Sequence, residues 1–286
     1  MPELQTGDGR RETGVGALER DDSLESREPQ SGEHSRLPSP VSRLLAPSRL
    51  PSPVSRLLVC LLGTMPYAAT LELQRAAARA RISGDLDTDV LLLVEHPPVI
   101  TLGRASKDAH LVASPELLAT RGVERFDVDR GGDVTFHGPG QLVGYPILDL
   151  KRHKQDLHWY LRQLEEALIV ALRLLGIDAT RKPGYTGVWV ADRKIASIGV
   201  HARDWVTWHG FALNVSTNLS WFDLIVPCGI RDVVMTSVVR ERDADVSPEL
   251  ARDCVVTGFE RVFSARAEPI QVQTLLDVVG PTNTPA

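Results

Sequence analysis

Cysteine is scarce in this chain of 286 residues, which has only Cys60, Cys228 and Cys254. An odd and small number of cysteines does not make a disulfide framework. No two of them have the close spacing that is typical of a structural zinc site. We therefore expect free thiols in a reducing compartment, the cytoplasm, and neither a metal nor another cofactor.

Long apolar runs and an excess of positive charge are also missing. The apolar stretch Leu57–Leu62 is far shorter than the roughly 20 residues of a membrane-spanning helix. It lies too deep in the chain for a signal peptide. The net charge is −5 and the pI is near 5.9, whereas nucleic-acid binders usually have a strongly basic face. We expect neither a membrane nor a nucleic acid as a partner.

Aromatic residues are absent before Tyr67, and this absence divides the chain. The first 58 residues are rich in Ser, Pro and Arg and cannot bury enough apolar area to fold. They contain an exact repeat, SRLPSPVSRLL, at Ser35–Leu45 and Ser48–Leu58. The repeat could be an extended docking motif, a duplication in a disordered tail, or translated sequence upstream of the true start. We predict a disordered extension at 1–58, one folded domain at 59–265 and a tail at 266–286.

Hydrophobic periodicity predicts alternating strands and helices in the folded part. Leucines recur every three or four residues between Asp156 and Leu175, which predicts a helix that stops at Gly176. A second helix is expected from a Thr64 cap to about residue 82, and the run at 90–95 is typical of a buried strand. Residues 187–191 and 194–201 predict a hairpin, and Pro146 favours an edge or irregular strand at 142–150. This order indicates an α+β (mixed α/β) domain.

A Gly-rich segment at 130–141 is the first candidate for chemistry. Four glycines and one proline lie within eleven residues between two apolar strands. Glycine lets the main chain approach a ligand closely. Arg130 could bind a phosphate or carbonyl group, and His137 could carry protons. A tight hairpin with structural glycines explains the same pattern equally well.

Two further segments carry a lysine and a cysteine. Lys194 begins a strand with small residues at Ala196, Ser197 and Gly199, which leave room for an acyl chain beside the strand. A lysine at such a position is more often at a solvated strand end. Cys228 lies between Pro227 and Gly229, in a turn where a thiol can be reactive. Cys60 and Cys254 have apolar neighbours and are expected in the core.

Together these segments resemble the octanoyltransferases of lipoate synthesis, the lipoate-protein ligase B family. The resemblance extends from about residue 60 to 265, with no departure at a motif position that would suggest an inactive member. Five matches occur in family order, namely EHPP at Glu95–Pro98, RGGDVTFHGPGQ at Arg130–Gln141, KIASIG at Lys194–Gly199, HGFALN at His209–Asn214 and PCG at Pro227–Gly229.

The resemblance implies a fold and a set of site residues. The implied fold is the mixed β-sheet flanked by helices that biotin and lipoate protein ligases share. Cys228 is similar to the nucleophile that carries the acyl thioester, and Lys194 to the residue that lowers its pKa. The implied substrate-binding residues are Arg130, Gly131, Gly132, Asp133, Val134, Thr135, Phe136, His137, Ser197, Ile198, Gly199, Gly210, Phe211 and Ala212.

The resemblance also implies an activity and partners. An acyltransferase of this family moves an octanoyl or lipoyl group from acyl carrier protein to a lysine of a lipoyl domain. The implied acceptors are the E2 subunits of 2-oxoacid dehydrogenases and the glycine cleavage H protein. Two alternatives are an ATP-dependent lipoate or biotin ligase on the same fold and a non-catalytic protein that binds lipoyl domains. Acidic partners would need a local basic patch, for which Lys151–Lys154 and Arg181–Lys182 are the candidates.

Overall fold

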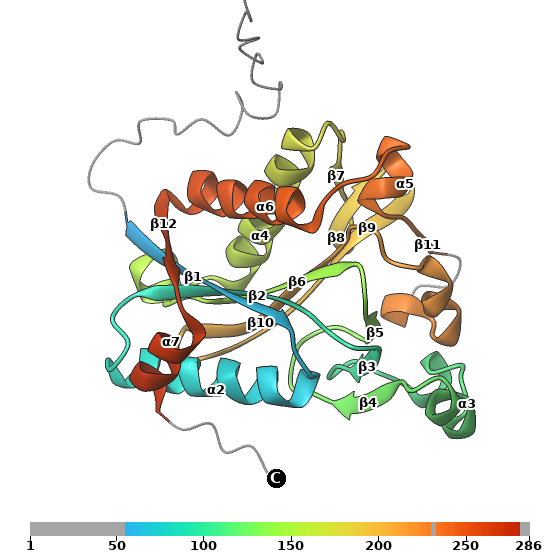
Figure 1. Ribbon diagram of the computed structural model, residues 1–286, viewed down its shortest axis with the longest axis horizontal. Helices are drawn as coiled ribbons and strands as arrows, with labels where there is room; N and C mark the ends of the chain where they lie inside the picture. Colours follow the sequence, from blue (N-terminus) through green and yellow to red (C-terminus); the bar gives the residue numbers. More distant parts are fainter. Residues whose placement is uncertain (1–54, 230–232, 281–286) are drawn as a thin grey trace, which may run out of the picture. The chain divides into compact units, whose positions relative to one another are not determined.

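The structure is a computed structural model that describes residues 55–229 and 233–280 (Figure 1). Its main element is a nine-stranded mixed sheet in the order β12-β1-β2-β6-β10-β9-β8-β7, with β11 paired to β9. These strands are β1 (Ser55–Thr64), β2 (Asp89–Glu95), β6 (Gln141–Ile147), β7 (Thr180–Lys182), β8 (Tyr185–Val190), β9 (Arg193–Arg203), β10 (Val206–Asn214), β11 (Val234–Met235) and β12 (Ala265–Ile270).

Helices cover both faces of this sheet. Figure 1 shows α4 (Leu157–Leu174) and α6 (Pro248–Phe263) on one face, and α2 (Tyr67–Ser83) and α7 (Val272–Val279) on the other. Alternation along β2 explains both layers, because Leu91 and Leu93 join the core under α4 and α6, while Val90, Leu92 and Val94 join the core under α2. The α+β class and the mixed sheet flanked by helices are confirmed.

A smaller sheet lies at one end of the molecule. It has the order β4-β3-β5, with β3 (Val99–Leu102), β4 (Glu124–Asp127) and β5 (Val134–His137). The short helices are α3 (Pro115–Thr120) and α5 (Val238–Arg242). The 3-10 turns are η1 (Asp108–His110), η2 (Leu150–Arg152), η3 (Leu219–Leu224) and η4 (Pro227–Gly229). A separate apolar cluster joins β3, β5, α3 and η3.

Local signals explain where the long helices start and stop. The Asp156 side chain accepts a hydrogen bond from Trp159 N at 3.0 Å and caps α4, and Gly176 adopts a positive φ of 80° after its end. These bounds confirm the predicted helix. The predicted Thr64 cap is wrong, because Thr64 is the last residue of β1 and Pro66 precedes α2 without a side-chain cap.

The boundaries of the folded part differ from those predicted at 59 and 265. β1 begins at Ser55 and pairs in parallel with β12, of which all but the first residue, Ala265, lies beyond the domain as predicted. Helix α7 follows, and its Leu275 is fully buried in the core under α2. The segment predicted as a tail is therefore part of the domain up to α7. Residues 1–54, including most of the predicted extension, and 281–286 lie outside the described residues.

The strand with Pro146 is not at an edge. β6 lies between β2 and β10 in the centre of the large sheet. Its pairing with β10 covers only residues 141–144, so Pro146 lies beyond that ladder, where the missing N–H is tolerated. Of the two predicted alternatives, the edge strand is wrong, whereas a ladder that ends before Pro146 fits the irregular strand. The sequence shows the proline but not where the pairing with β10 ends.

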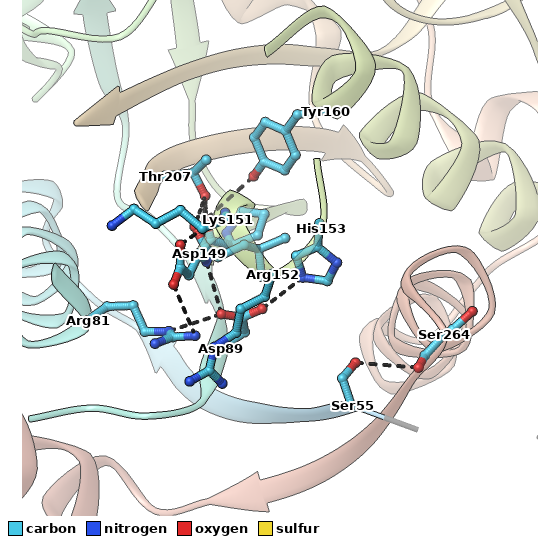
Figure 2. A network of polar contacts seen from close by, with 12 residues as sticks. Ser55, Arg81, Asp89, Asp149, Lys151, Arg152, His153, Tyr160, Thr207 and Ser264 are labelled. Carbon is cyan, nitrogen blue, oxygen red and sulfur yellow. Dashed lines mark hydrogen bonds and ion pairs between the residues drawn. The ribbon is translucent and has the colours of Figure 1, made fainter. Parts of the chain in front are cut away.

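The basic segment at 151–154 takes part in a polar network that links η2 and α2 to the start of β2 (Figure 2). Arg152 donates to the Asp87 carbonyl at 2.8 Å, and His153 Nε2 lies 3.0 Å from Asp89 Oδ2. Asp89 also binds Arg81 Nε at 3.0 Å, in an ion pair that is almost fully buried. Lys154 Nζ lies 3.0 Å from Asp156 Oδ2. Three of the four basic side chains therefore have polar partners among the described residues.

Two other sequence predictions can be compared with the structure. Cys60 and Cys254 are fully buried, as expected, and burial raises the pKa of each thiol to about 11. Across residues 55–229 and 233–280, no helix has the length and apolar character needed to cross a membrane.

Candidate active site

A cavity of about 340 Å³ lies along β9 and β10 and is closed by the Gly-rich segment after β4. Most of the predicted residues line it. Those in the wall are Arg130, Gly132, Asp133, Thr135, His137, Lys194, Ser197, Ile198, Gly199, Gly210, Phe211 and Ala212. Three sequence segments that are far apart in the chain therefore meet at one site.

Strand alternation divides the residues of β5 between two environments. Thr135 and His137 line the cavity. Val134 and Phe136 are fully buried in the neighbouring apolar cluster, where the Phe136 ring stacks on Trp221 with centroids 5.3 Å apart. Val134 and Phe136 thus support the wall from behind, which corrects their prediction as substrate-contacting residues.

Glycine allows the Gly-rich segment to lie directly on β9. Gly131 N donates to Val200 O at 2.8 Å. A Cβ atom on Gly199 would lie 2.8 Å from Gly131 O, which is too close for any side chain. Gly131 itself does not line the cavity. Its role is to attach the Gly-rich segment to β9 through the hydrogen bond to Val200.

Lys194 is buried at the wall of the cavity, with 2% of its surface exposed. Its Nζ lies 5.5 Å from the centroid of the Trp189 ring, a distance typical of a cation–π contact. Gly187 makes room for it, because a Cβ there would lie 2.7 Å from Lys194 Cε. A solvated strand end, which burial statistics favour for lysine, is therefore not its position.

The turn that carries Cys228 is η4, and the structure describes its backbone but not the cysteine side chain. After η4 the chain returns to the site as β11, in which Met235 pairs with Lys194. Thr236 N then donates to Lys194 O at 2.9 Å. The segment that follows Cys228 is thus hydrogen-bonded to the lysine, while their pairing as nucleophile and activator stays a prediction.

Two buried histidines lie around the cavity in defined tautomers. His96 Nδ1 contacts the Met65 carbonyl at 2.7 Å, so Nδ1 must carry the proton and Nε2 accepts from the Tyr145 hydroxyl. Gln141 donates to the Phe136 carbonyl, so its amide oxygen is the atom that receives the His137 Nδ1 proton. Burial lowers the pKa of His96 to about 4 and that of His137 to about 3. Both rings are therefore neutral near pH 7.

A third histidine pairs with a carboxylate. His209 Nε2 lies 2.7 Å from Asp129 Oδ1, and the hydrogen bond with His209 holds the pKa of Asp129 far below its usual range. Burial lowers the pKa of His209, although Asp129 opposes this shift. His209 adopts a φ of 55°, which is rare for a residue with a side chain, and its N–H donates to buried Gln74.

Sequence reasoning missed several residues of the wall. Tyr67, Val143, Tyr145 and His209 line the cavity, as do Gly184 of the β7–β8 turn and Tyr185 and Thr186 at the start of β8. His209 and Tyr145 stand inside or just after matched motifs, so the motifs did contain a signal. Nothing in the sequence distinguished Tyr67 or the β7–β8 turn from ordinary core and turn residues.

Comparisons with known proteins identify the family of this chain. The family model described as "Lipoyl protein ligase A/B catalytic domain" matches residues 66–260. An octanoyltransferase from Rubrobacter xylanophilus is 53% identical over 203 residues, which is 70% of this chain and 90% of the relative. One from Solibacter usitatus is 56% identical and covers 73% and 93% of the two chains.

This chain belongs to the lipoyl protein ligase A/B family. Solved structures agree at the level of the fold. A bi-partite lipoate protein ligase from Thermoplasma acidophilum superposes with a TM-score of 0.61 at 20% identity, over 79% of this chain and 90% of that one. Lipoate-protein ligase A bound with ATP gives 0.60 at 18% identity, over 79% and 92%.

Proposed function

We propose that the chain is an acyltransferase that moves an octanoyl group from acyl carrier protein to a lysine of a lipoyl domain through a thioester on Cys228. The observation that carries this proposal is the identity of 53% with an octanoyltransferase, of which the chain covers 90%. The cavity supports it, because Ile198 and Phe211 supply apolar wall for an acyl chain and Lys194 supplies a buried ammonium.

The first step exchanges one thioester for another. Cys228 thiolate attacks the octanoyl carbonyl, a sulfur–carbon bond forms, and the bond to the donor's pantetheine sulfur breaks. The leaving sulfur takes up the proton that Cys228 gave up. An ammonium close to a thiol favours the thiolate, which is the role proposed for Lys194. Because the exchange is close to isoenergetic, this step needs no ATP.

The second step forms an amide. A lysine amine of the acceptor attacks the Cys228 thioester and must lose a proton. His137 is a poor acceptor for that proton, because burial lowers its pKa to about 3. Its unprotonated Nε2 is suited to accept a hydrogen bond in the cavity. This contrast favours Lys194 as the base of the second step, because Lys194 is neutral once it has passed the Cys228 proton to the leaving pantetheine sulfur.

The proposed partners are octanoyl-acyl carrier protein as the donor and, as acceptors, lipoyl domains of E2 subunits and of the glycine cleavage H protein. Both classes are usually acidic, so a basic surface near the cavity would favour their encounter. Lys182 is close to the cavity, since it lies 5.9 Å from the ring centroid of Tyr185, a residue of the wall.

The test is formation of the acyl-enzyme without ATP. Wild-type protein is incubated with octanoyl-acyl carrier protein, and intact mass followed by peptide mapping locates the octanoyl group. We expect a hydroxylamine-labile adduct on Cys228, and amide product once a lipoyl domain is added. Cys228→Ser should form no thioester, while Cys254→Ser, a matched change in the core, should form it. Transfer from free octanoate that requires ATP and magnesium would instead show a ligase.

A further inference from the structure

The cysteine turn is held by a segment that no matched motif contains. η1 ends at His110, and the His110 carbonyl accepts from Val226 N at 2.7 Å. Leu111 and Ile225 form an antiparallel bridge next to this bond. The backbone around His110 is therefore hydrogen-bonded to the residues that precede η4.

The side chain of His110 holds the same turn from its other end. His110 Nδ1 lies 2.5 Å from Asp133 Oδ2, with 21% of the His110 side chain and 9% of the Asp133 side chain exposed. Gly229, the residue after Cys228, lies directly against this pair. A Cβ atom on Gly229 would collide with Asp133 Oδ2 and lie 2.9 Å from His110 Cε1.

Asp133 connects this pair to the cavity. Asp133 is a residue of the cavity wall, and its second carboxylate oxygen, Oδ1, accepts from Val134 N at 2.7 Å at the start of β5. Both oxygens are thus fixed, one by the backbone of β5 and one by the imidazole. A carboxylate held in this way gives the imidazole a single orientation against Gly229.

We propose that His110 and Asp133 form a positioning pair, which holds the Pro227–Gly229 turn in its place beside the cavity. The inference rests on the proposed role of Cys228. It adds His110 to the site and gives Asp133, a residue of the cavity wall, a positioning role. Asp133 orients the imidazole, the imidazole packs on Gly229, and the His110 carbonyl fixes Val226. The turn is thus held at Val226 and at Gly229, on both sides of Cys228. These contacts keep the turn at a constant distance from Lys194.

Alkylation of Cys228 tests this pair without depending on acyl transfer. The pH profile of iodoacetamide labelling at Cys228 is measured by peptide mass spectrometry, with buried Cys60 and Cys254 as internal unreactive controls. If the turn is no longer held in place, the pKa of the Cys228 thiol should move toward that of a free cysteine, about 8.5. We therefore expect His110→Ala and Asp133→Ala to raise the midpoint of the labelling profile.

Asp133→Asn is the conservative rescue. It keeps an oxygen for the His110 Nδ1 proton and should keep most of the wild-type midpoint. If Asp133 acted only through its charge, the labelling midpoint would fall instead of rising. Both Asp133→Ala and Asp133→Asn would then lower the pKa of the Cys228 thiol, because each removes a carboxylate near the thiolate. Midpoints that fall, or that stay unchanged in both alanine variants at an unaltered melting temperature, would overturn the proposal.

Single-turnover acylation separates the pair from the proposed function. With octanoyl-acyl carrier protein as donor, each alanine variant should form the acyl-enzyme at least about ten-fold more slowly, with little change in the donor concentration for half-saturation. The double variant should be no slower than either single one, since the two residues act as a unit. If the wild type forms no acyl-enzyme, the proposed function is contradicted but the positioning pair is not. The pair of His110 and Asp133 is tested separately, by the labelling profiles of Cys228.

Discussion

Lys194 combines features that rarely occur together in one lysine. It is almost completely buried, its ammonium lies over the Trp189 ring, and its backbone carbonyl binds Thr236 in the segment that follows Cys228. Burying an ammonium is unfavourable unless other interactions offset the cost. This placement in the cavity wall fits the role proposed for Lys194 in the transfer reaction.

We expect Lys194→Met to reduce octanoyl transfer by about 100-fold or more, the usual range for loss of a proton-transfer group. Methionine retains an apolar side chain of similar length, so the cavity wall should persist. Transfer is measured with labelled octanoyl-acyl carrier protein and an apo lipoyl domain. Lys151→Met is the control, because Lys151 is exposed in η2 and does not line the cavity. Equal activity in the two variants would remove Lys194 from the mechanism.

At the scale of residues, the sequence identified most of the wall but not its orientation. Strand periodicity alone would have separated Thr135 and His137 from Val134 and Phe136, because alternate residues face opposite sides. The prediction instead treats residues 130–137 as one continuous stretch of substrate-binding residues, which ignores this alternation. The burial of Lys194 was not accessible to sequence reasoning, because it depends on Gly187 and Trp189 of the adjacent strand.

At the scale of elements, the two candidate basic segments lie at opposite ends of β9. η2 is next to the β9–β10 turn, where Leu150 N donates to Trp205 O. Lys194 is at the other end of β9, eleven residues long, which is a separation of about 30 Å at ~3.3 Å per residue. Arg181 and Lys182 are in β7, whose partner β8 begins at the cavity-lining Tyr185. The geometry favours Lys182 over the segment at 151–154 as a contact for an acidic donor.

Charge reversal at these two places should therefore have different effects. Lys182→Glu is expected to raise the KM for octanoyl-acyl carrier protein several-fold at low salt, with the difference shrinking as salt screens the charges. Lys151→Glu changes the net charge by the same amount at the far end and should leave the KM unchanged. Steady-state rates at two salt concentrations are the measurement. A larger effect from Lys151→Glu would place the donor at η2 instead.

Elements differed in how well the sequence predicted them. α4 has its own period, cap and stop, so local signals were sufficient. β12 has no such signal, because it is a strand only through its pairing with β1, more than two hundred residues earlier in the chain. The position of Pro146 in a central strand likewise depends on where the β10 ladder ends.

At the scale of the whole molecule, the cavity brings buried neutral histidines into the folded state. His96 and His137 have pKa values of about 4 and about 3 in the fold, against about 6.5 for an exposed histidine. Between these values the unfolded chain binds protons that the folded chain does not. Stability therefore falls as the pH drops from about 6.5 toward 4, by an amount on the order of a few kcal/mol for the two rings together.

The melting temperature should thus decrease steadily between pH 7 and pH 4.5, before most carboxylates are protonated. Calorimetry of wild type and of His137→Gln, measured at each pH, isolates the contribution of one ring. The variant loses a titrating group, so its melting temperature should depend less steeply on pH in this window, whatever its stability at pH 7. His158→Gln is the control, because His158 is exposed on α4. Parallel curves for His137→Gln and wild type would mean that His137 does not contribute to the acid sensitivity.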